Sequence, residues 1–106
     1  MKILITGAAG QISYSLVPFL CERGIFASKE KLDLSLVEIP PAMKKLDGFV
    51  KELEDSAYSS VNSINTYDNI NDAGLDADWC LVVGSIPRGI VLNGKEIKER
   101  ADLLQI

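Results

Sequence analysis

Six consecutive residues near the start of the chain could bind an anion through their backbone. They are Gly7, Ala8, Ala9, Gly10, Gln11 and Ile12. Glycines let a chain turn sharply and let backbone approach a phosphate without a clash with a Cβ atom. The segment follows a short apolar run and opens a stretch with helical spacing, and a helix N-terminus offers free N–H groups to an anion. The pattern therefore predicts a loop that binds the pyrophosphate of a dinucleotide, although a plain strand-to-helix turn is the alternative, and Ser13 stands where a third glycine is common.

Glu38 is the second candidate, because it follows the next apolar run along the chain. A carboxylate at the end of the second strand can accept both hydroxyls of an adenosine ribose. It would also repel a 2′-phosphate, so NAD is favoured over NADP. Two alternatives stay open: Glu38 is an exposed strand-end residue, or the acid is Asp33 and the register of the strand differs by a few residues.

These candidates need elements that bring them together. The spacing predicts strands over 2–6, 32–39, 61–66 and 79–83, and helices over 11–23, about 43–57 and 95–106. It also predicts a loop with a short helical turn over 68–76 and a second loop over 85–94. Alternation of this kind predicts a parallel sheet with right-handed crossovers. We expect an α/β, Rossmann-like sheet with helices on both faces. We also expect residues 1–106 to be the N-terminal, dinucleotide-binding portion of a truncated doubly wound fold, with the catalytic or substrate domain absent.

Two details concern the predicted helices. Pro18 lies inside the first, where proline should cause a kink or an early end. The second carries an apolar seam, which consists of Met43, Leu46, Val50, Leu53 and Ala57. The seam is interpreted either as core packing or as a partly shared dimer face, where Gly48 would let another backbone come close.

Composition excludes several classes of function. The chain has 106 residues, of which 47% are hydrophobic and 25% charged, and a net charge of −4. These values are typical of a globular chain, and the lack of a basic patch argues against nucleic acid and against a membrane surface as partners. There is no histidine, which removes a Ser-His-Asp site, a histidine-ligated metal and a histidine base from these residues.

The two cysteines, Cys21 and Cys80, have no disulfide or zinc spacing. Both lie in apolar runs, so we expect two reduced core residues. The apolar run after Met1 is too short for a signal peptide or a membrane span. We therefore expect a cytoplasmic protein without a metal site.

Four blocks of sequence, in order, resemble the cytosolic-type malate dehydrogenases of the lactate/malate dehydrogenase family. The blocks are Gly7 to Leu16 (GAAGQISYSL), Leu46 to Gly48 with Glu52 to Ala57 (LDG and ELEDSA), Val83 to Arg88 (VGSIPR) and Glu99 to Leu104 (ERADLL). Together they span nearly the whole chain, which is far more specific than a glycine-rich loop alone.

The resemblance implies an NAD-dependent enzyme of the tricarboxylic acid cycle that interconverts malate and oxaloacetate as a homodimer. It implies that Gly84 and Ser85 line the cofactor, and that Arg88 binds the distal carboxylate of a dicarboxylate substrate. It also implies that Arg100, on a closing loop, polarises the keto oxygen. Guanidinium groups suit both tasks, because they pair with carboxylates and stabilise developing negative charge. The interval from Arg88 to Arg100 is longer than in the relatives, which places an apparent insertion at 89–98.

The family's proton-transferring histidine has no counterpart here. We therefore expect no catalytic residue within this chain, and no turnover by these residues alone.

Two other classes of function remain open. An extended short-chain dehydrogenase, such as a nucleotide-sugar epimerase, could share the opening Met1 to Gly7, although the block at Gly84 to Arg88 argues against it. A non-catalytic nucleotide-binding module would fit the lack of histidine and the early end of the chain.

Overall fold

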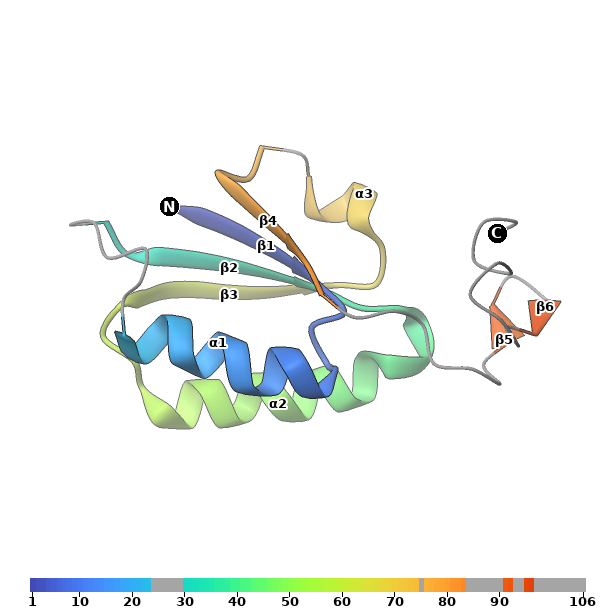
Figure 1. The fold of residues 1–106 in the computed structure, drawn as a ribbon, viewed down its shortest axis with the longest axis horizontal. Helices are drawn as coiled ribbons and strands as arrows, with labels where there is room; N and C mark the ends of the chain where they lie inside the picture. Colours follow the sequence, from blue (N-terminus) through green and yellow to red (C-terminus); the bar gives the residue numbers. More distant parts are fainter. Residues whose placement is uncertain (24–29, 75, 84–90, 93–94, 97–106) are drawn as a thin grey trace.

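In a computed structural model, which describes residues 1–23, 30–74, 76–83, 91–92 and 95–96, the chain folds around one parallel sheet (Figure 1). Its strands are β1 (Lys2–Thr6), β2 (Leu32–Val37), β3 (Val61–Tyr67) and β4 (Trp79–Val82). Their order across the sheet is β3-β2-β1-β4, and each neighbouring pair is parallel. The predicted α/β sheet is therefore confirmed. Only strand ends differ: β2 and β4 stop earlier than expected, and β3 runs one residue further.

The sheet order reverses at β1. From β1 the chain builds β2 and β3 on one side, and then returns to place β4 on the other. In open α/β sheets, ligands bind outside the carboxyl ends of the strands at such a reversal. The topology therefore points to the carboxyl edge of β1 and β4 as the place to look for a site.

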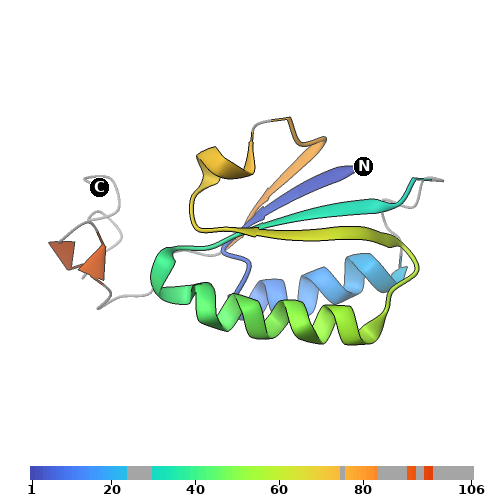
Figure 2. The same ribbon diagram turned by 180° about the vertical axis from the view of Figure 1, so that it is seen from behind.

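Two long helices cover one face of the sheet (Figure 2). They are α1 (Gln11–Arg23) and α2 (Met43–Ser56), and a 3₁₀ turn (Pro40–Ala42) precedes α2. The short helix α3 (Ile70–Ala73) lies on the other face. α1 continues through Pro18 to its predicted end, so of the two effects expected of the proline, the early helix end is wrong.

The main core lies between the sheet and the two long helices. Its buried residues are Ile3, Ile5, Ala8, Ala9, Val17, Cys21, Leu32, Leu34, Leu36, Leu46, Phe49 and Leu53. On the opposite face, Leu4 and Val37 pack against Ala73 of α3. Successive side chains of a strand point to opposite faces, so the unbroken apolar run of β1 places apolar side chains in both cores.

The apolar seam of α2 packs into this core, as the first interpretation held. Leu46 and Leu53 are buried, but so is Phe49, which the seam did not include. Ala57 is exposed, because it lies just beyond the helix in a left-handed conformation with φ of 49°. A Cβ built on Gly48 would have no heavy atom within 4 Å, so no backbone among the described residues approaches it.

A second, two-stranded sheet corrects one predicted helix and part of the loop predicted over 85–94. β5 (Val91–Leu92) pairs antiparallel with β6 (Lys95–Glu96). The helix expected from Lys95 therefore does not begin there, and its remainder lies outside the described residues. The reason is local: Asn93-Gly94 between the strands is the pair most typical of a two-residue hairpin loop.

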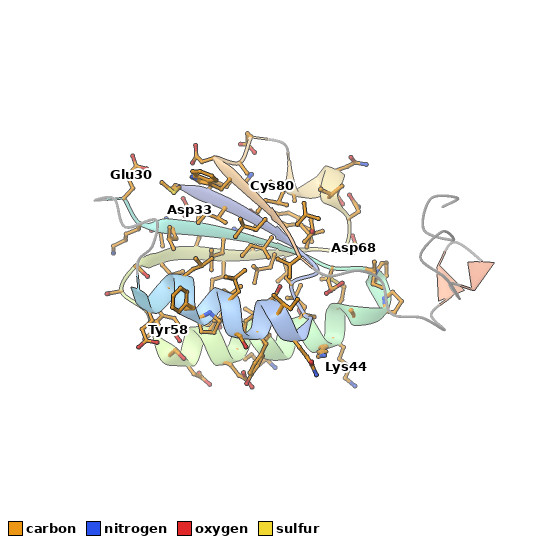
Figure 3. The ribbon with its side chains drawn as sticks, in the orientation of Figure 1. Glu30, Asp33, Lys44, Tyr58, Asp68 and Cys80 are labelled. Atoms are coloured by element: carbon orange, nitrogen blue, oxygen red, sulfur yellow. The ribbon has the colours of Figure 1, made fainter. Side chains whose placement is uncertain are left out.

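The cysteines differ in environment. Both are free thiols, and Cys21 is buried as expected. Cys80 is exposed, so its assignment to the core is wrong (Figure 3). β4 has β1 on one side only within the described sheet, and the face of β4 that carries Cys80 and Val82 is open.

The described residues lack two kinds of feature. None of their helices is long and apolar enough to cross a membrane. They also contain no group of three or more histidine, cysteine or acidic side chains placed to hold a metal ion.

Candidate nucleotide-binding site

The predicted loop connects β1 to α1 at the carboxyl edge of the sheet (Figure 1). Gly7 has φ of 65°, a left-handed conformation that favours glycine. The backbone N–H of Gly10 donates to the Gly7 carbonyl, with a distance of 3.0 Å between nitrogen and oxygen. A Cβ on Gly10 would lie 3.2 Å from that same oxygen. Gly7 is therefore favoured by its backbone conformation, and a side chain at position 10 would crowd the Gly7 carbonyl.

Ser13 supplies a contact where a third glycine is common. Its side chain is fully buried, and its Oγ donates to the Gly7 carbonyl over 3.0 Å. The Gly7 oxygen thus accepts from both Gly10 and Ser13, which ties the turn to the first turn of α1. The departure from glycine was visible in the sequence, but this function of the hydroxyl was not.

The two alanines fit the loop against the strands. Ala8 is fully buried and Ala9 is 6% exposed. The backbone N–H of Ala8 donates to the carbonyl of Val37, at the end of β2, over 3.2 Å. Small side chains are needed here, because the loop packs directly into the main core.

Glu38 follows β2 at the same edge and reaches the loop. One oxygen of its carboxylate, Oε2, accepts a hydrogen bond from the backbone N–H of Ala9 at a distance of 2.9 Å. The other oxygen, Oε1, accepts from the N–H of Ile39 at a distance of 3.0 Å. The N–H of Glu38 itself donates to the Tyr67 carbonyl at a distance of 3.1 Å. The structure therefore brings the predicted acid and the predicted loop together, through a direct contact that sequence reasoning did not anticipate.

The alternative acid, Asp33, is excluded by its position. It pairs with Lys2 at the amino end of β1, the edge opposite the loop (Figure 3). Its carboxylate accepts from Asn62 over 2.8 Å and from Ser63 over 2.7 Å. These two hydrogen bonds hold the pKa of the Asp33 carboxyl below its ordinary value.

α1 is held in place partly through Tyr14. Its ring lies 5.3 Å from the ring of Phe49 on α2, at an interplanar angle of 37°. A hydrogen bond from the Tyr14 hydroxyl to Glu52 raises the pKa of Tyr14 above its ordinary value. These contacts orient the N-terminus of α1, and with it the loop, relative to α2.

Gln11 and Ile12 begin α1 and are exposed, Ile12 by 63%. They also form one end of a shallow surface groove of about 540 Å³ along α1, lined by Gln11, Ile12, Ser15, Leu16 and Phe19. The groove does not include the glycines or Glu38. The loop is the better candidate for the nucleotide site than the groove, because the Glu38 carboxylate and the tight turn from Gly7 to Gly10 lie at the loop.

Four predicted residues, Gly84, Ser85, Arg88 and Arg100, lie outside the described part of the chain. Just before them, the N–H of Val83 donates to the Thr6 carbonyl over 3.3 Å. β4 therefore ends beside β1, at the same edge as the loop.

A family model described as the lactate/malate dehydrogenase, NAD binding domain, matches residues 1–106. The chain belongs to the lactate/malate dehydrogenase family. The short-chain dehydrogenase alternative is thereby excluded, and this domain of the family binds NAD. The local geometry fits that coenzyme, since the loop has no side chain at its tightest point and a carboxylate lies beside it.

Named members of the lactate/malate dehydrogenase family are similar over most of the chain. A malate dehydrogenase of Magnetococcus marinus is 41% identical over 106 residues, which is 100% of this chain and 31% of that protein. The crystal structure of malate dehydrogenase from Naegleria fowleri matches with a TM-score of 0.78 and 36% identity, over 98% of this chain and 30% of that one. The chain thus spans about a third of the length of these relatives.

A lactate dehydrogenase is about as similar. The Trichomonas vaginalis enzyme, in complex with NADH and oxamate, matches with a TM-score of 0.74 and 36% identity, over 81% of this chain and 26% of that one. The relatives of this NAD-binding domain therefore include both malate and lactate dehydrogenases.

Proposed function

We propose that this chain is the N-terminal, NAD-binding part of an enzyme that transfers hydride between NAD and the malate/oxaloacetate pair. The observation that carries the proposal is the contact of Glu38 with Ala9 at the carboxyl edge, in a domain whose family binds NAD. Gly7 and Gly10 would let the coenzyme's pyrophosphate approach the loop, and Glu38 would accept hydroxyls of its adenosine ribose. When bound, NAD supplies the hydride chemistry.

Arg88 supports a dicarboxylate over lactate or pyruvate. Malate and oxaloacetate carry a second carboxylate, which needs a cationic partner in a site that excludes water. The Arg88 guanidinium can pair with it through two parallel hydrogen bonds. The segment Ile86-Pro87-Arg88 is also part of the resemblance to malate dehydrogenases.

Arg100 and Gly84 to Ser85 complete the proposed set. A guanidinium at the keto oxygen would stabilise the negative charge that grows there during reduction. Gly84 and Ser85 follow β4, where a coenzyme at the switch point would pass. These 106 residues contain no histidine. If the family's histidine supplies the proton to the substrate oxygen, that histidine lies outside them.

The decisive test is substrate selectivity of the intact protein. We expect NADH to be consumed with oxaloacetate, and much more slowly with pyruvate. Arg88→Gln should lower kcat/KM for oxaloacetate by about 30- to 1,000-fold, the loss typical of truncating one partner of a buried charge pair. Pyruvate turnover should change far less. A higher kcat/KM for pyruvate in the unaltered protein would contradict the malate assignment and favour lactate.

We propose further that the protein is a cytoplasmic homodimer. The resemblance to cytosolic-type malate dehydrogenases and the free thiols support this proposal. The exposed, uncrowded Gly48 on α2 is a suitable place for a second copy to approach. Light scattering of the intact protein should give twice the mass of one chain, and Gly48→Arg should shift it toward the monomer.

A further inference from the structure

The carboxylate of Glu38 has both oxygens bound to backbone amides. The contact with Ile39 is local, since that residue is next in the chain. The contact with Ala9 joins residues 29 positions apart and connects β2 to the loop. The carboxylate of Glu38 therefore lies 2.9 Å from a loop amide.

The Ala9 amide differs from its two neighbours in the kind of acceptor it has. Ala8 donates to the backbone carbonyl of Val37, and Gly10 donates to that of Gly7. Neither carbonyl can leave without moving a strand end or the turn. The acceptor at Ala9 is a side-chain carboxylate that is only half-buried, and rotation about its own bonds can withdraw it.

This arrangement treats two kinds of ligand differently. A free phosphate or pyrophosphate ion that approached Ala9 would meet the Glu38 carboxylate there, and two anions in contact repel each other strongly. A sugar hydroxyl meets no such barrier, because it can donate to the carboxylate and accept from the amide at once. The contact therefore discriminates by charge and by hydrogen-bond donors.

We propose that Glu38 excludes bare anions from the glycine-rich loop: its carboxylate occupies the Ala9 amide in the free protein, and yields it only to a ligand that also offers hydroxyl donors. The loop then selects a nucleotide over inorganic phosphate and pyrophosphate. This inference rests on the proposed coenzyme site, but it concerns what that site rejects.

Pyrophosphate is the probe, with the intact protein and Glu38→Gln, which keeps the length of the side chain and removes its charge. We expect pyrophosphate to bind Glu38→Gln about tenfold more tightly than the unaltered protein, and NAD to bind it more weakly. Any variant that loses a carboxylate gains some affinity for anions, so a matched control is needed. Asp68→Asn removes one charge beyond β3 at the same edge (Figure 3), from a side chain that accepts a hydrogen bond from Asn69.

The control variant separates the effect of the Glu38–Ala9 contact from the effect of removing one negative charge from the surface. Asp68→Asn should change pyrophosphate affinity less than about twofold, because an exposed charge is screened by salt. An equal gain in the two variants would overturn the proposal, as would no gain in Glu38→Gln. Circular dichroism checks that both variants fold.

A direct readout uses protein labelled with ¹⁵N-alanine. The Ala9 amide signal should shift in Glu38→Gln, stay in place when pyrophosphate is added to the unaltered protein, and move when NAD is added. An Ala9 signal that is unaffected by Glu38→Gln would contradict the contact. Failure of NAD to bind the unaltered protein would instead refute the proposed function, and the pyrophosphate comparison would still be readable.

Discussion

The Oγ of Ser13 donates a hydrogen bond to the Gly7 carbonyl, six residues earlier and across the tightest part of the loop. Because Gly7 also accepts from Gly10, its carbonyl oxygen is the point where the turn and α1 are joined. The residue that replaces a third glycine therefore adds rigidity to a loop that glycine alone would leave free.

Ser13→Ala should lower the free energy of unfolding by about 1 kcal/mol, because a buried hydrogen bond is lost while Gly10 still satisfies the carbonyl. Urea denaturation measures this change. Ser15→Ala, at an exposed position on the same helix, is the control and should stay within about 0.5 kcal/mol of the unaltered protein. Equal effects would show that the Ser13 contact adds nothing.

Gly10→Ala should weaken NAD binding about threefold to tenfold, equivalent to about 0.7–1.4 kcal/mol. The added Cβ would lie 3.2 Å from the Gly7 oxygen, so the loop must move by a few tenths of an ångström. Gly48→Ala is the matched control, since it adds the same atom in the open middle of α2. It should leave the NAD Kd unchanged, because no heavy atom of the described residues outside α2's own backbone lies within 4 Å of the added Cβ. Calorimetric titration with NAD distinguishes the two.

The Asp33 carboxyl should contribute stability that depends on pH. Its pKa is lowered in the folded protein, so its hydrogen bonds with Asn62 and Ser63 stabilise the fold at pH values above 3.8, its ordinary pKa. That contribution is lost as the pH falls from there through the lower folded pKa. Asp33→Asn should therefore lower the urea midpoint at pH 6, and the difference from the unaltered protein should shrink below about pH 4. A difference that grows on acidification would mean that the sign is wrong.

Cys21 should be nearly inert in the folded protein. Burial raises the pKa of its thiol to about 11, and the thiolate is the reactive form. In a Cys80→Ser background, an aromatic disulfide reagent at pH 8 should modify Cys21 only as fast as the protein unfolds. Rapid labelling without urea would show that the thiol is accessible and would contradict the structure.

The sequence predicted the loop and Glu38 because both depend on local signals. A strand, two glycines and a helix start are adjacent in the chain, and the acid at the end of the next strand must reach the same edge of a parallel sheet. What could not be predicted is the direct contact of Glu38 with Ala9. It depends on side-chain rotation and on the close approach of segments 29 residues apart.

The errors share a physical origin. Spacing alone suggested Ala57 for the seam of α2 and passed over Phe49, because periodicity does not show where a helix ends or how wide its buried face is. Cys80 lies in an apolar run, but exposure depends on what covers a strand, which no single strand reveals. From Lys95, apolar residues recur at helical spacing, but the adjacent Asn93-Gly94 sequence favours a hairpin, and β5 pairs with β6.

The central place of β1 has a consequence for how the chain is made. β1 is synthesised before both of its neighbours, since its partner on one side starts at Leu32 and Ile3 pairs on the other side with Trp79, 76 positions later. At ribosomal rates of about 5–20 residues per second, roughly 4–15 seconds pass before the second partner emerges. During that interval one edge of β1 is unpaired, and an unpaired apolar strand can pair with the wrong segment. A circular permutant in which β4 precedes β1 should therefore bind less chaperone during translation.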